Sequence, residues 1–389
     1  METKAKTYKI ALIFLIIAIM FHSSSLTENK NINLIIFLSC ISFSLLLVLL
    51  KKILIKDDTF NKFIFTFSIL ITFSLITSFW SIQKAQTLGA SINLIIPSIL
   101  VLFISIEIGK KISVNEFTNV TFKTFLFVFL IFSINSIFTL ENERLKGMFD
   151  NSNQLGMLTA FIFILMINNQ IREQKVMRSL PYIFIYILII IGTFSRGSIL
   201  MMGIGITVIA LTTFIQKRTS LIKKITVFAL YSLGVTTVLI VVIGSRGIEI
   251  DRRFQLFELG KSIINLEGHG YGTTGYILAS FGMPWFNSWH NTYIGLLVEG
   301  GLIWLVIGLY LLFKPLLQFF KYKTQLNQID KNYWLNSILG IVLATMASQY
   351  FEFQLLRNTP FFYLYVTFLG IITVNIMKES ERERNSNCI

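Results

Sequence analysis

The sequence predicts an all-α, polytopic integral membrane protein with about 12 transmembrane helices and one large loop outside the membrane. Of its 389 residues, 54% are hydrophobic and only 14% are charged, and the mean hydropathy is +0.70. A soluble domain is about 45–50% apolar and about 25% charged. With only two cysteines, this composition excludes a disordered chain, a secreted disulfide scaffold and a soluble nucleic-acid-binding protein.

The apolar runs define the predicted helices, because a helix needs roughly 20 apolar residues to cross a bilayer. The first and sixth runs are short for a full crossing. Only Arg196 and Gly197 separate the seventh and eighth, which predicts a tight hairpin with Arg196 at its tip. The twelve runs are residues 8–21, 32–50, 63–82, 87–109, 122–140, 155–167, 180–195, 198–215, 225–244, 292–313, 335–353 and 359–377.

The distribution of basic residues predicts that both termini are cytoplasmic. With that orientation, the inside segments carry more than twice as many lysines and arginines as the outside segments, as the positive-inside rule requires. The chain then divides into helices 1 to 9 (residues 1–244), an outer loop (245–291), helices 10 to 12 (292–377) and a cytoplasmic tail (378–389). The net charge of +14 is explained by basic loops facing anionic lipid, so no nucleic-acid partner is expected.

The outer segments keep arginine where the inner segments mostly use lysine. A guanidinium group binds phosphate oxygens in pairs, so this bias indicates a ligand carrying phosphate or carboxylate. Arg196, Arg252 and Arg253 are the candidates. The alternatives are a snorkelling side chain for Arg196 and ordinary solvated charges for the two loop arginines.

The outer loop contains a predicted amphipathic helix over residues 251–264, with Phe254 and Phe257 on its apolar side. Such a helix would lie on the membrane surface or cover a cavity. The glycine-rich stretch GHGYGTTG follows it. Its glycines allow either a close approach of the backbone to a ligand or a flexible turn, and both readings stay open.

His290 opens the tenth run near the outer interface, where an imidazole can accept a proton near neutral pH. The alternative is a helix-capping residue without a chemical role. Glu299, further along the same run, is an acid that a proton-coupled transporter would use. Together, a histidine base and several arginines suit a reaction in which a hydroxyl acceptor attacks a sugar carbon and a diphosphate leaves.

Four motifs resemble those of the O-antigen ligase and Wzy-type polysaccharide polymerase family. HNTYIGLLVEGG, from His290 onward, is similar to the family's His-Asn, nine residues, Gly pattern, although Trp304 stands where the family usually has Gly, Thr or Tyr. GTFSRGSIL (192–200) resembles its Ser-Arg-Gly hairpin. GMFDNSNQLG (147–156) resembles its Gly-x-x-x-Asn-x-Asn element, and GHGYG (268–272) its glycine-rich segment.

The resemblance implies a C-type glycosyltransferase-like fold with a large periplasmic loop, in the bacterial inner membrane. The donor would be an undecaprenyl-diphosphate-linked glycan, and no cofactor or metal would be needed. It also implies that His290 is the base, that Arg196 and either Arg252 or Arg253 bind the diphosphate, and that other residues support them. The supporting residues are Asn291, Asn151, Asn153 and Gly301.

Two activities within the family stay open. An O-antigen ligase of lipopolysaccharide biosynthesis would transfer the glycan to lipid A–core, and it is the favoured expectation. A polymerase would transfer it to a second lipid-linked glycan, which the Asn151–Asn153 element favours. A hypothesis of a different class is a lipid-linked sugar flippase or another transporter.

Overall fold

The computed structural model describes residues 2–22, 30–51, 58–138, 144–216, 247–286, 288–326 and 328–386. Within these ranges the chain is helical and contains no strand, so the all-α prediction is confirmed for this part. The helices are α1 (Glu2–Phe21), α2 (Lys30–Lys51), α3 (Asp58–Ile76), α4 (Lys84–Gly109), α5 (Val114–Phe138), α6 (Ser152–Arg172), α7 (Leu180–Gly192), α8 (Arg196–Gln216), α10 (Gly247–Ile263), α11 (Thr274–Ser280), α12 (Thr292–Tyr322), α13 (Gln328–Ser348) and α14 (Pro360–Ser386).

Eight helices of the described chain are long and apolar enough to cross a membrane, so the chain is a multi-pass membrane protein. They coincide with eight of the predicted runs. The sixth run, expected to be short, is a full helix of 21 residues, because polar residues at both of its ends also join α6. The seventh run is a shorter apolar helix, Met177–Gly192. The ninth, 225–244, lies outside the described residues, and the total of 12 stays a prediction.

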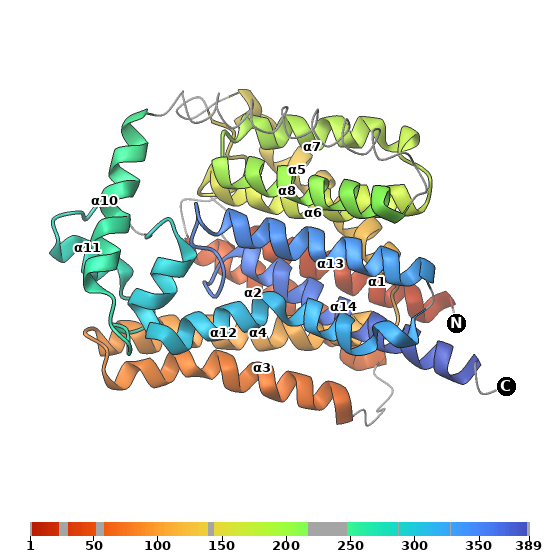
Figure 1. Cartoon of the computed structure of the whole chain (residues 1–389), viewed down its shortest axis with the longest axis horizontal. Coiled ribbons are helices and arrows are strands. Elements are labelled where there is room, and N and C mark those ends of the chain that lie inside the picture. The colour runs from red at the N-terminus through yellow and green to blue at the C-terminus, as the bar shows by residue number, and fades with distance from the viewer. Residues whose placement is uncertain are drawn as a thin grey trace.

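The long helices run roughly along one direction, and α10 lies across one end of them (Figure 1). We call this the α10 end. Helix α1 begins and α14 ends at the opposite end (Figure 1). Helices α6, α8, α12 and α14 all begin at the α10 end. The positive ends of four helix dipoles therefore face the same end of the bundle, which favours negative charge there.

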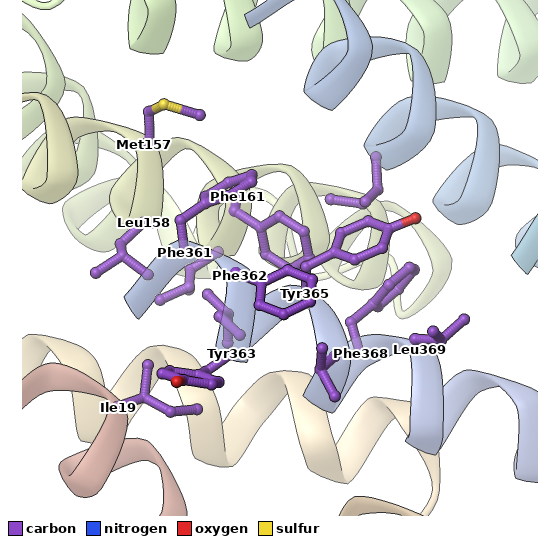
Figure 2. Close-up of a cluster of buried hydrophobic side chains, with 14 of the residues drawn as sticks. Ile19, Met157, Leu158, Phe161, Phe361, Phe362, Tyr363, Tyr365, Phe368 and Leu369 are labelled. Atoms are coloured by element: carbon purple, nitrogen blue, oxygen red, sulfur yellow. The ribbon is translucent and has the colours of Figure 1, made fainter. Parts of the chain in front are cut away.

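Helix α14 forms the centre of the bundle, since every residue of its apolar window is buried. Figure 2 shows its aromatic side chains packed against Phe161 of α6 and Ile19 of α1. The ring of Phe161 makes edge-to-face contacts with Phe361 at 5.9 Å and with Phe368 at 5.6 Å. Such pairs add about 0.5–1.5 kcal/mol each to the stabilisation from burial. This packing fixes the helices whose first residues build the α10 end.

Helix α12 is broken at Gly301, whose backbone has φ +67° and ψ −162°. The glycine-rich stretch occupies the break. His269 N–H donates to the Val298 carbonyl at 2.8 Å, and Gly270 N–H donates to the Glu299 carbonyl at 2.8 Å. These bonds satisfy carbonyls that a broken helix would leave unpaired, a necessity in an apolar surrounding. The close approach that the glycines allow is therefore made to the backbone of α12.

We predict that Gly301→Ala destabilises the protein. A β-carbon at this position would lie 2.0 Å from the Leu266 carbonyl oxygen, and the backbone conformation alone costs a non-glycine residue about 1–3 kcal/mol. The measurement is the melting temperature of the detergent-solubilised protein. Gly275→Ala is the matched control, because a β-carbon there meets no atom within 4 Å. Equal melting temperatures for both variants would contradict this account of the break.

Candidate functional site

A cavity of about 190 Å³ opens at the α10 end. Its walls come from α8, α10, the start of α12 and the loop after α13, segments that are far apart in the sequence. The lining residues are Arg196, Arg253, Phe254, Phe257, Trp289, His290, Asn291, Tyr350 and Phe351. The fold thus brings three of the four predicted catalytic and diphosphate-binding residues, Arg196, Arg253 and His290, to one cavity. Asn291, one of the predicted supporting residues, lines the same cavity.

Arg196 is the first residue of α8 and is 6% exposed. The predicted hairpin tip is corrected here: α7 ends at Gly192, the turn comprises residues 193–195, and Arg196 and Gly197 are already helical. The Ser195 hydroxyl explains this start, because it accepts hydrogen bonds from the Ser198 amide at 3.4 Å and from the Ser198 hydroxyl at 2.7 Å, as an N-capping side chain does. Arg196 therefore combines its own charge with the positive end of a helix dipole.

Arg253 lies on α10, which confirms a helix in the segment where residues 251–264 were predicted to form one. The buried side of α10 agrees with the prediction at Phe257, which packs against the hydrophobic core, and differs from it at Phe254. Leu256 is fully buried, whereas Phe254, expected on the apolar side, is 64% exposed. Gly260 sets this orientation, since a β-carbon there would lie 2.4 Å from Ile294 of α12. The Arg252 side chain lies outside the part of the chain that the structure describes.

Arg253 also contacts the loop that joins α13 and α14. Its Nη1 donates a hydrogen bond of 3.1 Å to the Phe351 carbonyl, and its Nη2 lies 3.9 Å from Oε1 of Glu352. The guanidinium group is therefore held at the cavity wall by contacts from a different part of the chain.

His290 lies directly before α12 with φ +51°, a conformation that is uncommon for residues other than glycine. Its side chain is 19% exposed, and its ring meets Phe286 edge to face at 6.2 Å. The next residue, Asn291, caps α12, because its Oδ1 accepts a hydrogen bond of 3.0 Å from the Ile294 amide. Capping is therefore done by Asn291, and the imidazole of His290 is left to line the cavity.

Glu352 is a site residue that sequence reasoning missed. It is 3% exposed, in the loop between α13 and α14. Its Oε2 lies 3.9 Å from Nδ1 of His290, and its Oε1 lies 3.9 Å from Nη2 of Arg253. A scarce acid near the end of an apolar run was the available signal, but the sequence alone did not show which cations it would meet.

A second layer of polar residues holds Glu352 from behind the cavity. Asn153 Nδ2 donates to Glu352 Oε1 at 2.6 Å, and Arg144 Nη2 donates to Asn153 Oδ1 at 2.6 Å. Arg144 also donates from Nε to the Thr193 carbonyl at 2.9 Å, in the turn before Arg196. Asn153 is thus a supporting residue through Glu352, whereas Asn151 caps α6 by accepting from the Asn153 amide at 2.7 Å.

The first turn of α12 is joined to the loop after α13 by Thr292. Its hydroxyl bonds to Gln349 Oε1 at 2.5 Å and to the Glu352 carbonyl at 2.8 Å. Gln349 Oε1 also accepts from the Leu355 amide at 3.0 Å. These bonds fix the position of Glu352 relative to His290, two residues before Thr292.

A second buried acid lies apart from the cavity lining. Glu299 is fully buried, and its Oε1 accepts from Arg357 Nη1 at 3.1 Å and from the Thr274 hydroxyl. Tyr271 of the glycine-rich stretch is fully buried nearby, and desolvation raises the pKa of its phenol well above the ordinary value, although the Arg357 charge opposes this. The ion pair of Glu299 with Arg357, together with the bond from Thr274, holds the glycine-rich stretch against α12. Glu299 and Gly301 therefore determine the structure of the half-helix that follows His290.

The other two histidines have structural surroundings. The His269 ring bonds through Nε2 to the Ile263 carbonyl at 2.8 Å. The His22 ring packs edge to face on Phe37 and Tyr363 at 4.7 and 5.0 Å. Desolvation lowers the pKa of His22 to about 4, although a hydrogen bond to Asn358 opposes the shift. His22 is therefore a neutral packing residue at physiological pH.

No protein-family model matches the chain, and no curated protein matches it significantly. Within the described ranges, no group of three histidine, cysteine or acidic side chains is placed to hold a metal ion. The chemistry of the cavity is therefore inferred from its own side chains. The positive charges of Arg196 and Arg253 outnumber the one carboxylate beside them, that of Glu352, so the cavity favours an anion. The imidazole of His290 can accept a proton.

We predict that Thr292→Val destabilises the α10 end. The change removes the hydroxyl that bonds to Gln349 Oε1 and to the Glu352 carbonyl, and losing a buried hydrogen bond costs about 1–3 kcal/mol. A lower melting temperature of the solubilised protein is the expected result. Thr207→Val is the control, because that hydroxyl bonds only to the Gly203 carbonyl of its own helix at 2.8 Å. Two variants as stable as the wild type would contradict the proposed link between α12 and the loop.

Proposed function

We propose that this protein is a membrane glycosyltransferase that acts at the outer face of the bacterial inner membrane. Its donor is an undecaprenyl-diphosphate-linked glycan, and its acceptor is a sugar hydroxyl. The favoured activity is that of an O-antigen ligase, with lipid A–core as acceptor. This proposal joins the resemblance of four motifs to the chemistry of the cavity, and both termini are then cytoplasmic.

The observation that carries the proposal is the meeting of Arg196, Arg253 and His290 in one cavity. Residue type and motif alone, without spatial information, indicate these residues as candidates. A transferase that releases a lipid diphosphate needs cations for the leaving group and a base for the acceptor, in reach of one another. Phe254, Phe257 and Tyr350 add apolar and aromatic walls to the same cavity, which suit a substrate with both lipid and sugar parts.

The proposed reaction is a displacement at the anomeric carbon of the donor sugar. The acceptor hydroxyl gives its proton to Nε2 of His290, and its oxygen forms the new bond to the anomeric carbon. The bond from that carbon to the diphosphate oxygen breaks, and the diphosphate keeps the electron pair. Arg196 and Arg253 stabilise the added negative charge, and the imidazolium afterwards returns its proton to water.

A polymerase is the alternative with the same donor chemistry, in which the acceptor is a second lipid-linked glycan. Asn153 supports this alternative through the motif to which it belongs, but its contact with Glu352 serves either activity. A flippase or another transporter is the alternative of a different class. In that protein His290 would be dispensable, so one variant separates the two classes.

We predict that His290→Ala abolishes polysaccharide assembly. The variant and the wild type are expressed at matched membrane levels in a strain that lacks the chromosomal copy, and the surface polysaccharide is resolved on a gel. Loss of the base removes about 10²- to 10⁴-fold in rate. Long glycan that remains on the lipid carrier indicates a ligase, whereas acceptor capped by a single repeat unit indicates a polymerase.

His269→Asn is the control for this experiment, because the ring of His269 lies outside the cavity lining and bonds to the backbone. It should support wild-type polysaccharide at equal protein level. A wild-type pattern from His290→Ala would exclude the proposed base and would favour transport.

We also predict that Arg253→Gln weakens the binding of undecaprenyl diphosphate to the purified protein in nanodiscs. Losing hydrogen bonds from a charged donor costs about 1.5–3 kcal/mol, or about 10- to 100-fold in Kd. Lys261→Gln is the matched control, because Lys261 is another cation of α10 whose ammonium group pairs with Glu258 at 2.8 Å. If both variants bind as the wild type does, Arg253 does not hold the diphosphate.

A further inference from the structure

The geometry points to Glu352 as the positioning residue of this site: its carboxylate orients the His290 ring so that Nε2 faces the acceptor hydroxyl. The inference rests on the proposed function, because it assigns a partner to the proposed base. Neither the motifs nor the charge distribution along the sequence assigns a role to Glu352.

The first argument is the burial of the carboxylate. An ionised carboxylate that is removed from water is costly unless cations and hydrogen-bond donors surround it. Glu352 is 3% exposed, and the groups that face it come from four segments. They are His290 before α12, Arg253 of α10, Asn153 of α6 and, through Asn153, Arg144. Arg196 of α8 adds a further positive charge to the same cavity.

The second argument is that the carboxylate is held in place from behind. Oε1 accepts the hydrogen bond from Asn153, whose own amide oxygen is fixed by Arg144. Gly197, in the first turn of α8, leaves the space that Glu352 fills, because a β-carbon there would lie 3.3 Å from Glu352 Cγ. Among the described residues no hydrogen-bond donor anchors Oε2, and it lies 3.9 Å from Nδ1 of His290. The carboxylate thus has one oxygen for its support and one for His290.

The third argument is the nitrogen that faces Glu352. Nδ1 of His290 lies 3.9 Å from Oε2 and has no hydrogen-bond partner in the described chain. A carboxylate beside Nδ1 favours the tautomer that carries its proton on Nδ1, which leaves the lone pair on Nε2 free to accept a proton. The separation is longer than a hydrogen bond, as is common for catalytic contacts without substrate. Binding of the acceptor shortens it by a small rotation of the ring.

Arg253 connects this contact to donor binding. In the absence of substrate, Glu352 lies 3.9 Å from both Arg253 and His290. A diphosphate at Arg253 competes with Glu352 for the guanidinium group and leaves the carboxylate to the imidazole. The positive charge that forms on His290 during transfer is then stabilised when the donor is in place.

We predict that Glu352→Gln changes the state of His290 and lowers the transfer rate. The chain has only three histidines, so ¹⁵N-histidine spectra of the purified protein in nanodiscs resolve His290 by comparison with His290→Ala. Without the carboxylate, the Nδ1–H tautomer of His290 loses population relative to the Nε2–H tautomer. Polysaccharide assembly falls by about 10- to 100-fold, a part of the effect of losing the base itself.

Two further variants make the result specific. Glu352→Asp keeps the charge but shortens the side chain, and it should restore the Nδ1–H tautomer more than the rate. Glu299→Gln removes the other buried, arginine-paired acid and should leave the tautomer of His290 unchanged. If Glu352→Gln does not accumulate, Glu352→Asp is compared directly with the wild type, and a normal tautomer with normal activity overturns the proposal.

The two proposals fail in different ways. If His290→Ala is inactive while Glu352→Gln has the wild-type tautomer and rate, the role of Glu352 is wrong and the base assignment stands. If His290→Ala is fully active, the proposed function is wrong, whatever the spectra show for Glu352.

Discussion

The arrangement of the α10 end depends on one buried carboxylate, that of Glu352. It lies where the first turns of α6, α8 and α12 meet, next to Asn153, Gly197 and Thr292. Three helix dipoles place their positive ends there, so a negative charge is stabilised without full neutralisation by one partner. A buried carboxylate without partners is costly, so the surrounding donors and cations cannot move away without a loss of stability. The same constraint brings His290 and Arg253 to one cavity.

The half of α12 that follows His290 is fixed at both of its ends. Asn291 caps its start, and Gly301 ends it where the glycine-rich stretch inserts. The loop after α13 contacts the same half-helix twice, through Glu352 beside His290 and through Arg357, which binds Glu299. The motif of His-Asn, nine residues and Gly therefore corresponds to one half-helix that is anchored at both ends. These anchors hold the imidazole at one place relative to the arginines, as the proposed transfer between two bound substrates would require.

Most of the helical fold was predictable because the apolar runs reflect the thickness of a bilayer, which acts on each helix separately. Arg196 and His290 were also predictable, because each departs from what topology or packing alone requires, whereas the sequence did not separate Arg253 from Arg252. Glu352 and Arg144 were not, since their importance comes from neighbours that are remote in the sequence. The apolar pattern of α10 likewise did not show that Gly260, the residue closest to α12, would set its rotation and leave Phe254 exposed. Local patterns predicted the elements, and tertiary contacts determined which side chains meet.

The proposed function requires that the cavity bind a lipid diphosphate beside a proton-accepting histidine. The most direct test is an experimental structure of the protein in nanodiscs with undecaprenyl diphosphate bound. The account predicts density for the diphosphate against the guanidinium groups of Arg196 and Arg253, with His290 Nε2 facing the side that the sugar would occupy. A diphosphate bound elsewhere, for example at the opposite end of the bundle, would contradict it.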